Sequence, residues 1–213
     1  MHSDLLELAG IYREAALAGL DPRTQSSMGQ FFTPTRAAAL IASMPRLPQA
    51  GSLRIIDPGA GSGVLSAAII ARILDETSDV TAHVVAVEAD PAVLPHLLKT
   101  LDACETAGRG RVTYEMVEAD YIFASTGLSA DVRLDGFDLC IQNPPYAKLP
   151  SKSPVRAAIR AFGADAPNLY AAFLALGAAS LVEGGSWWQS LPARLRTDHI
   201  SVPFGAICFP KSR

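Results

Sequence analysis

The chain has 213 residues, of which 49% are hydrophobic, and this length provides for one α/β domain with a sizeable core. Its formal net charge of −3 excludes a global attraction to nucleic acid or to an anionic membrane, so any basic surface must be local. The N-terminus lacks the pattern of a secretory signal, and the most apolar stretch, Gly63 to Leu74, is too short to cross a bilayer, so we expect a cytoplasmic protein.

The first 50 residues are predicted to form a helical segment interrupted by one loop. Apolar residues recur at helical spacing from Leu5 to Leu17. A polar loop over residues 23–30 then leads to the sequence FFTP at positions 31–34. A second helix is expected from Thr35 to Met44, because alanine favours helix and Thr35 can cap its first turn.

From residue 53 onward, strand patterns and helix patterns alternate. Such alternation requires crossover connections, so the sequence predicts an α/β fold with a mainly parallel sheet and helices on both faces. In sheets of this kind, ligands bind beyond the carboxyl ends of the strands. The expected strands cover residues 53–57, 83–88, 111–120, 137–142 and 186–192, and the expected helices cover 63–74, 91–104 and 168–182, the last closed by Gly184 and Gly185.

A glycine-rich segment, DPGAGSG at 57–63, follows the first expected strand. Glycines at alternate positions allow a tight backbone turn and leave room for a ligand to approach the main chain. The spacing G-x-G-x-G differs from the G-x-G-x-x-G of dinucleotide sites, so a pyrophosphate is not the first choice. A plain glycine-rich turn is the alternative interpretation.

The next two strand ends carry acidic residues. Glu88 is placed to accept two hydrogen bonds from a ribose diol, and Asp90 before Pro91 serves as the helix cap that Glu88 would otherwise provide. Asp120 and Tyr121 suit an adenine ring, since the carboxylate can accept from the exocyclic amine and the phenol ring can cover one face. No P-loop lysine and no metal-binding cluster accompany these residues. The pattern therefore indicates an adenosine-shaped pocket without a phosphate clamp, as for S-adenosylmethionine.

Five motifs occur in the order found in amino-methylating DNA methyltransferases: GQFFTP at 29–34, DPGAGSG at 57–63, Glu88, Ala119-Asp120, and NPPY at 143–146. From residue 29 to residue 185 the chain resembles the adenine-N6 enzymes of bacterial restriction-modification systems. The resemblance implies a Rossmann-like S-adenosylmethionine-dependent methyltransferase fold with its catalytic core at 51–185.

The resemblance also implies roles for individual residues around the cofactor. The loop of the N-terminal segment would contact the cofactor, with Thr33 at the methionine moiety. Asp57 and the glycine loop would lie near its amino-acid end, Glu88 would hold the ribose, and Asp120 with Tyr121 would hold the adenine. Phe173 would pack nearby. The loop glycines are Gly59, Gly61 and Gly63.

The catalytic candidates are Asn143, Pro144, Pro145 and Tyr146. Two prolines cannot donate ladder hydrogen bonds, so the preceding strand must end near Gln142. If the Asn143 side-chain oxygen and the Pro144 carbonyl accept the two hydrogens of the adenine amine, its lone pair becomes localised for direct methyl transfer. The Tyr146 ring offers a surface on which an extruded base can stack.

A local basic stretch follows the motif and contains Lys148, Lys152, Arg156 and Arg160. Ser153-Pro154 predicts a helix start, which puts the two arginines one turn apart on the same face. These residues are either phosphate contacts beside the flipped base or the solvated face of a helix.

Residues 186–213 form an atypical tail with little periodicity, and they lack the strands with which the family continues. We therefore expect a truncated or frame-shifted form, with target recognition or an endonuclease in another subunit. The three cysteines, Cys104, Cys140 and Cys208, are expected to be buried free thiols. The expected partner is double-stranded DNA, with no membrane and no metal. The alternatives are methylation of a protein glutamine or an RNA guanine, and an inactive fragment that binds the cofactor.

Overall fold

The computed structural model describes residues 3–20, 32–128 and 132–189, and in these ranges it is built around one parallel sheet. The strands are β1 (Ala50–Pro58), β2 (Asp79–Glu88), β3 (Val112–Glu118), β4 (Phe137–Gln142) and β5 (Leu181–Gln189), in the order β3-β2-β1-β4-β5. All four neighbouring pairs are parallel, which confirms the predicted sheet. The strand order reverses between β1 and β4, and this is the point where open α/β sheets bind ligands.

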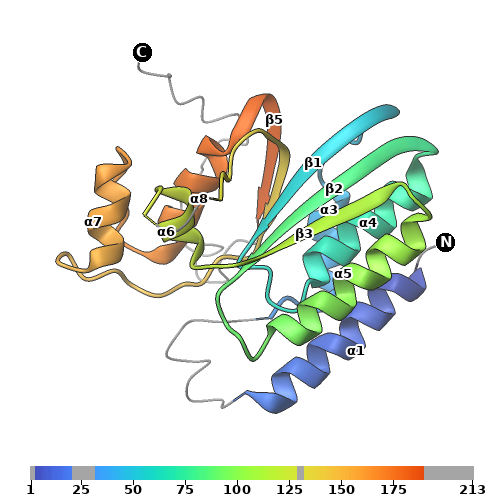
Figure 1. Cartoon of the computed structure of the whole chain (residues 1–213), viewed down its shortest axis with the longest axis horizontal. Helices are drawn as coiled ribbons and strands as arrows, with labels where there is room; N and C mark the ends of the chain where they lie inside the picture. The colour runs from blue at the N-terminus through green and yellow to red at the C-terminus, as the bar shows by residue number, and fades with distance from the viewer. Residues whose placement is uncertain (1–2, 21–31, 129–131, 190–213) are drawn as a thin grey trace.

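Helices cover both faces of the sheet, as Figure 1 shows. One face carries α1 (Ser3–Gly19), α3 (Thr35–Ser43), α4 (Val64–Glu76) and α5 (Leu94–Gly108), and the other carries α6 (Tyr121–Ser125), α7 (Pro154–Ala161) and α8 (Leu169–Ala179). Successive strand residues point to opposite faces. Ile55 accordingly lies in one hydrophobic cluster with α4 and α5, and Ile56 lies in the other with α6 and α8.

Several predicted boundaries shift for local reasons. Pro34 takes the cap position of α3 and Thr35 is already helical, so the predicted threonine cap is wrong. α5 begins at Leu94 instead of Pro91, because residues 91–93 form a turn first. β3 ends at Glu118, before Asp120 caps the short helix α6, which the sequence had suggested only as an irregular segment.

The end of the described chain departs most from expectation. α8 ends at Ala179, and the chain passes directly into β5, so Gly184 and Gly185 do not close a helix. They lie within a strand whose register with β4 shifts between Phe137 and Leu139, and Gly184 adopts a φ of 83°. Glycine relieves such irregularities in a strand. β5 also crosses the boundary expected between residues 185 and 186. The expected strand end at 190–192, the rest of the tail, the loop at 23–30 and Cys208 lie outside the described residues.

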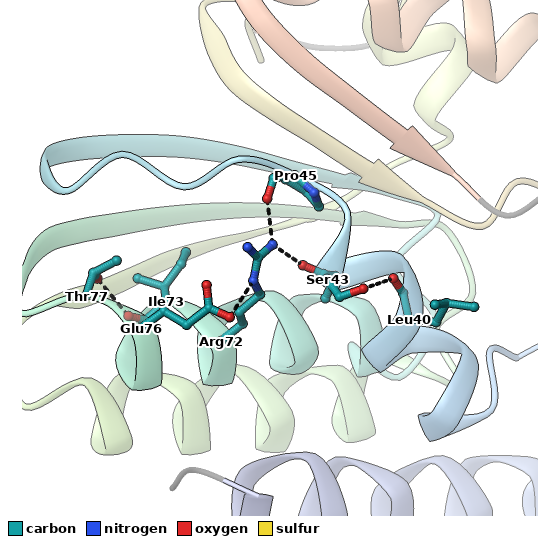
Figure 2. A network of polar contacts seen from close by, with 8 residues as sticks. Leu40, Ser43, Pro45, Arg72, Ile73, Glu76 and Thr77 are labelled. Atoms are coloured by element: carbon teal, nitrogen blue, oxygen red, sulfur yellow. Dashed lines mark hydrogen bonds and ion pairs between the residues drawn. The ribbon is translucent and has the colours of Figure 1, made fainter. Parts of the chain in front are cut away.

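A partly buried arginine joins the N-terminal segment to the sheet layer. The Arg72 side chain on α4 is 18% exposed and donates to the carbonyl oxygens of Ala42 and Pro45, each at 2.7 Å, and to Glu76 at 3.0 Å. Figure 2 shows the guanidinium between Pro45 and Glu76. These bonds fix the carboxyl end of α3, the helix that starts two residues after Thr33.

We predict that Arg72→Ala lowers the free energy of unfolding by about 1–3 kcal/mol, because two partly buried carbonyl groups lose a charged donor. Urea unfolding followed by circular dichroism measures the change. Arg46→Ala, at an exposed neighbouring position, is the control and should change stability by less than about 0.5 kcal/mol. Equal losses in the two variants would contradict the role given to Arg72.

Candidate active site

A cavity of about 210 Å³ opens at the carboxyl ends of β1, β2 and β3, beside the loop that follows β4 and the first turns of α8. It collects residues that are far apart in the sequence. Nine of the residues singled out from the sequence line it: Thr33, Gly59, Gly61, Glu88, Asp120, Tyr121, Asn143, Pro145 and Phe173. Phe32 and Leu169, for which no role was predicted from the sequence, also line the cavity.

The glycine loop forms one wall of the cavity because its backbone is left-handed. Gly59 and Gly61 have φ values of 66° and 56°, which L-residues with a side chain adopt only with strain. A Cβ atom at Gly59 would lie 3.3 Å from the Phe173 ring, and one at Gly61 would lie 3.3 Å from the Phe32 ring. The two aromatic rings thus face the loop where side chains are missing. Phe32 belongs to the GQFFTP motif, and its aromatic side chain in that motif is the feature from which a place at the cavity could have been predicted.

Gly63 serves packing and does not line the cavity. It precedes α4 with a φ of 82°, and a Cβ atom there would lie 3.0 Å from both Leu97 and Thr100 of α5. The third glycine therefore allows α4 and α5 to approach each other. Its expected contact with a cofactor has no support in this geometry.

Glu88 is buried, with 7% of its surface exposed, at the end of β2. Its Oε2 accepts from the Gly61 N–H at 2.8 Å, and its Oε1 accepts from the Ala89 and Asp90 N–H groups at 2.8 and 2.9 Å. Glu88 thus makes structural bonds to the backbone in addition to lining the cavity. Asp90 itself accepts from Ala92 N–H within the turn before α5. The three N–H donors fix the Glu88 carboxylate at the cavity wall, where Oε2, which accepts only one of them, retains further acceptor capacity.

Asp120 and Tyr121 lie at the end of β3. Asp120 caps α6, since its Oδ1 accepts from Ile122 and Phe123 N–H at 2.9 and 3.2 Å. Tyr121 is 3% exposed, and its ring packs against Phe173 with 4.9 Å between centroids. Burial raises the pKa of the Tyr121 phenol, so it stays neutral. Both residues line the cavity. Asp120 does so as the cap of α6, and Tyr121 does so as part of the hydrophobic cluster that contains Ile56.

Asp57 is buried beneath the cavity and does not line it. Its Oδ2 accepts from the Ser66 hydroxyl at 2.7 Å, which links β1 to α4, while its Oδ1 has no hydrogen-bond partner among the described residues. Desolvation by burial raises the pKa of Asp57 to about 7, although the bond from Ser66 opposes this shift. A buried carboxyl at this position therefore binds its proton much more tightly than an exposed one.

The NPPY motif leaves the sheet as the prolines require, since β4 ends at Gln142. Asn143 and Pro145 line the cavity, whereas the buried Pro144 and the half-buried Tyr146 are not among its lining residues. The Tyr146 hydroxyl donates to Asn143 Oδ1 at 3.3 Å. The motif thus bridges two regions, with its first residue at the cavity and its tyrosine outside.

Helix α8 contacts the NPPY motif and the residue before it. The Gln142 amide donates to the Phe173 carbonyl at 3.4 Å, and the Tyr170 ring stacks on the Tyr146 ring. Tyr170 was not predicted from the sequence as a residue of the site. An aromatic residue three positions before Phe173, in the same helix turn, was the available signal.

The basic stretch is partly neutralised within the chain. Ser153 caps α7 as predicted, and Arg156 and Arg160 share a face of this helix, but both donate to Asp165, with Nε–Oδ1 distances of 3.0 and 3.3 Å. These ion pairs raise the pKa of Arg156 and lower the pKa of Asp165. Lys148 and Lys152 are exposed.

Cys104 and Cys140 are buried free thiols, as predicted. Desolvation raises the pKa of both, so the thiol three residues before Asn143 is protonated and unreactive. Within residues 3–20, 32–128 and 132–189, no group of three His, Cys, Asp or Glu side chains could hold a metal ion. No helix in these ranges is long and apolar enough to cross a membrane.

Comparison with known proteins supplies independent findings. Residues 6–168 match the family model described as N-6 DNA Methylase. The chain is 32% identical over 178 residues to the Type II methyltransferase M.PstI of Providencia stuartii, covering 81% of this chain and 34% of the relative. It is 30% identical over 169 residues to the Type II methyltransferase M.BsuBI of Bacillus subtilis, covering 76% and 33%. The chain therefore spans about one third of the length of these relatives.

Solved structures share the fold. A protein of Listeria monocytogenes described as a class I S-adenosylmethionine-dependent methyltransferase aligns with a TM-score of 0.57 at 16% identity, over 87% of this chain and 56% of that one. The methyltransferase subunit of a type I restriction-modification system from Streptococcus thermophilus aligns with a TM-score of 0.53 at 22% identity, over 75% and 34%. The predicted Rossmann-like methyltransferase fold is thereby confirmed.

We predict that Asp57 makes the protein less stable as the pH rises from about 4 to about 7. Its pKa is raised in the folded state, so the folded protein keeps the proton that the unfolded chain releases above about pH 4. The stabilisation that comes from this bound proton is complete below the pKa of Asp57 in the unfolded chain. It is lost as the pH rises through the pKa of Asp57 in the folded protein, and the total loss is up to about 4 kcal/mol. Asp57→Asn removes this titration, so the variant should gain stability relative to the wild type with increasing pH.

Urea unfolding at pH 4.5, 5.5, 6.5 and 7.5 tests the Asp57 prediction. Asp79→Asn, at an exposed position in β2, is the matched control and should show a profile parallel to that of the wild type. A parallel profile for Asp57→Asn as well would refute the prediction.

Proposed function

Because the chain belongs to the N-6 DNA methylase family, we propose that it transfers a methyl group from S-adenosylmethionine to the N6 amine of adenine in DNA. One observation carries the proposal: Asn143 and Pro145 line the same cavity as the glycine loop and Glu88. A group bound on the loop would therefore lie beside the amide of the NPPY motif. The relatives named above as Type II methyltransferases are consistent with this reaction.

The residues around the cavity fit the chemical parts of S-adenosylmethionine, which supplies an activated methyl group on a sulfonium. Gly59 and Gly61 leave the loop backbone open to close approach. The buried Glu88 carboxylate can accept from a ribose hydroxyl, because backbone donors hold it in place and leave acceptor capacity at Oε2. Asp120 and the Tyr121–Phe173 pair provide a polar and an aromatic side for adenine, and Thr33 lies at the cavity for the methionine moiety.

Asn143 and the carbonyl of Pro144 would accept the two hydrogens of the target amine. The lone pair of that nitrogen is normally delocalised into the ring, and two acceptors in fixed positions favour a tetrahedral nitrogen that can attack. The proline pair stiffens the loop, so this acceptor geometry is set before the base arrives. The reaction needs no enzyme nucleophile, in agreement with the protonated state of Cys140.

We propose double-stranded DNA as the substrate partner, with the target adenine extruded onto Tyr146. Lys148 and Lys152 are the better candidates for phosphate contact, since Arg156 and Arg160 pair with Asp165. Recognition of the DNA sequence would come from a further segment or a separate subunit, and an endonuclease could associate in the same way. Action on DNA places the protein in the cytoplasm.

A second candidate is cofactor binding without methyl transfer, since the cavity with its glycine loop and Glu88 would suffice for that role. Radiolabelled methyl transfer to DNA, followed by nucleoside analysis, distinguishes the two. Detection of N6-methyl-2′-deoxyadenosine supports the proposal, and binding in a calorimetric titration with S-adenosylmethionine without transfer supports the second candidate. Release factor and ribosomal RNA are tested as alternative substrates in parallel assays, since a planar amide or a guanine amine would also suit Asn143.

We predict that Asn143→Ala lowers the rate constant of methyl transfer at least about a hundredfold and leaves the affinity for S-adenosylmethionine nearly unchanged. The variant loses an acceptor for the amine while the glycine loop and Glu88 stay in place. Transfer is measured by radiolabelling and affinity by calorimetry. A comparable loss of both would contradict the division between cofactor and base residues.

We predict that Tyr146→Ala weakens base capture by about 1–3 kcal/mol, because it removes the stacking ring, and that Tyr146→Phe is milder. The phenylalanine variant keeps the ring and loses the hydroxyl bond to Asn143, so its remaining defect should lie in the rate constant of transfer. Steady-state kinetics with DNA as the varied substrate separates these effects. Equal damage to KM in the two variants would argue against stacking.

A further inference from the structure

The first turn of α8 presents two different faces to the candidate site. Leu169 and Phe173, four residues apart, line the cavity. Tyr170 is one residue further than Leu169, about 100° around the helix, and its ring stacks on Tyr146. One helical turn therefore contacts both the cofactor region and the aromatic residue of the NPPY motif.

The Tyr146–Tyr170 pair has the geometry of a stack. The ring centroids are 5.8 Å apart and the planes differ by 22°, within the range of favourable aromatic pairs. Both residues are half-buried, and neither belongs to the two hydrophobic clusters of the described chain. The stack therefore does not fill the core, and a role in orienting Tyr146 is the better account.

Backbone hydrogen bonds hold the two tyrosines together. Leu169 N–H donates to the Ala147 carbonyl at 2.9 Å, and Leu149 N–H donates to the Pro167 carbonyl at 3.0 Å. Each tyrosine is thus next to a residue of this pairing. The Asn168 side chain accepts from Ala171 N–H at 2.8 Å and fixes the start of α8. The pairing sets the separation of the rings before any ligand binds.

We propose that Tyr170 is a positioning residue that holds the Tyr146 ring in the plane required to receive the target base. This inference rests on the proposed function. Tyr170 stacks against one face of Tyr146, so the base does not touch Tyr170 and gains affinity from a ring that is already ordered. Because the Tyr146 hydroxyl donates to Asn143 Oδ1, an oriented ring also orients the amide acceptor. A contact chain thus runs from α8 through Tyr146 to Asn143.

The test uses the full chain saturated with S-adenosylhomocysteine and a single-stranded oligothymidine that carries one 2-aminopurine. A single strand offers the base without the cost of extrusion. Quenching of the 2-aminopurine fluorescence reports stacking and gives an apparent Kd. We expect Tyr170→Ala to weaken binding about two- to tenfold, and Tyr170→Phe to bind like the wild type because the ring remains.

Three comparisons separate positioning from a general structural defect. Tyr170→Ala should bind S-adenosylhomocysteine with unchanged affinity, and it should cause no further loss in a Tyr146→Ala background, since it acts through that ring. Tyr114→Ala removes a half-buried tyrosine from the opposite edge of the sheet and should bind the probe like the wild type.

The outcomes distinguish this inference from the proposed function. Unchanged probe binding in Tyr170→Ala, or an additive loss in the double variant, overturns the role of Tyr170. A wild-type protein that binds S-adenosylhomocysteine but leaves the fluorescence unchanged overturns it as well. A wild-type protein that quenches the probe yet yields no N6-methyl-2′-deoxyadenosine in DNA refutes the proposed transfer and leaves the positioning role supported by the variants.

Discussion

The hydrogen bond from Gly61 N–H to the Glu88 carboxylate is the contact on which the candidate site depends. It joins the loop after β1 to the end of β2 and fixes a left-handed backbone that only glycine adopts readily. Two more N–H groups hold the same carboxylate. A buried polar group is tolerated when it is hydrogen-bonded, so these bonds stabilise the Glu88 side chain at the cavity wall.

Asp57 shows the opposite solution for a buried carboxyl. It lies one strand away from Glu88, with one hydrogen bond from Ser66 and one oxygen without a partner in the described chain. Desolvation then outweighs hydrogen bonding, and the pKa rises to about 7. Two carboxyl groups at neighbouring strand ends thus differ in their bonds because one faces the cavity and the other faces α4.

Helix α8 brings the two halves of the site into one rigid arrangement. Its residues Leu169 and Phe173 line the cavity, its Phe173 carbonyl accepts from Gln142 beside the motif, and its Tyr170 stacks on Tyr146. Loops at a sheet edge are usually the mobile part of a fold. Here the loop after β4 is fixed to a helix on one side and to the sheet on the other, which suits a site that relies on fixed acceptors.

The sequence by itself determined the parallel sheet, the place of the cavity and nine of its lining residues, because the alternation of strands and helices puts successive strand ends at one edge. It also determined that β4 stops at Gln142, since the prolines cannot continue a ladder. Only the tertiary structure decided that Gly63 packs against α5, that Asp57 is buried below the cavity, that Asp165 pairs with both arginines of α7, and that Tyr170 stacks on Tyr146. The physical reason is that local pattern fixes the backbone path, whereas a side chain's role depends on neighbours that come from distant parts of the chain.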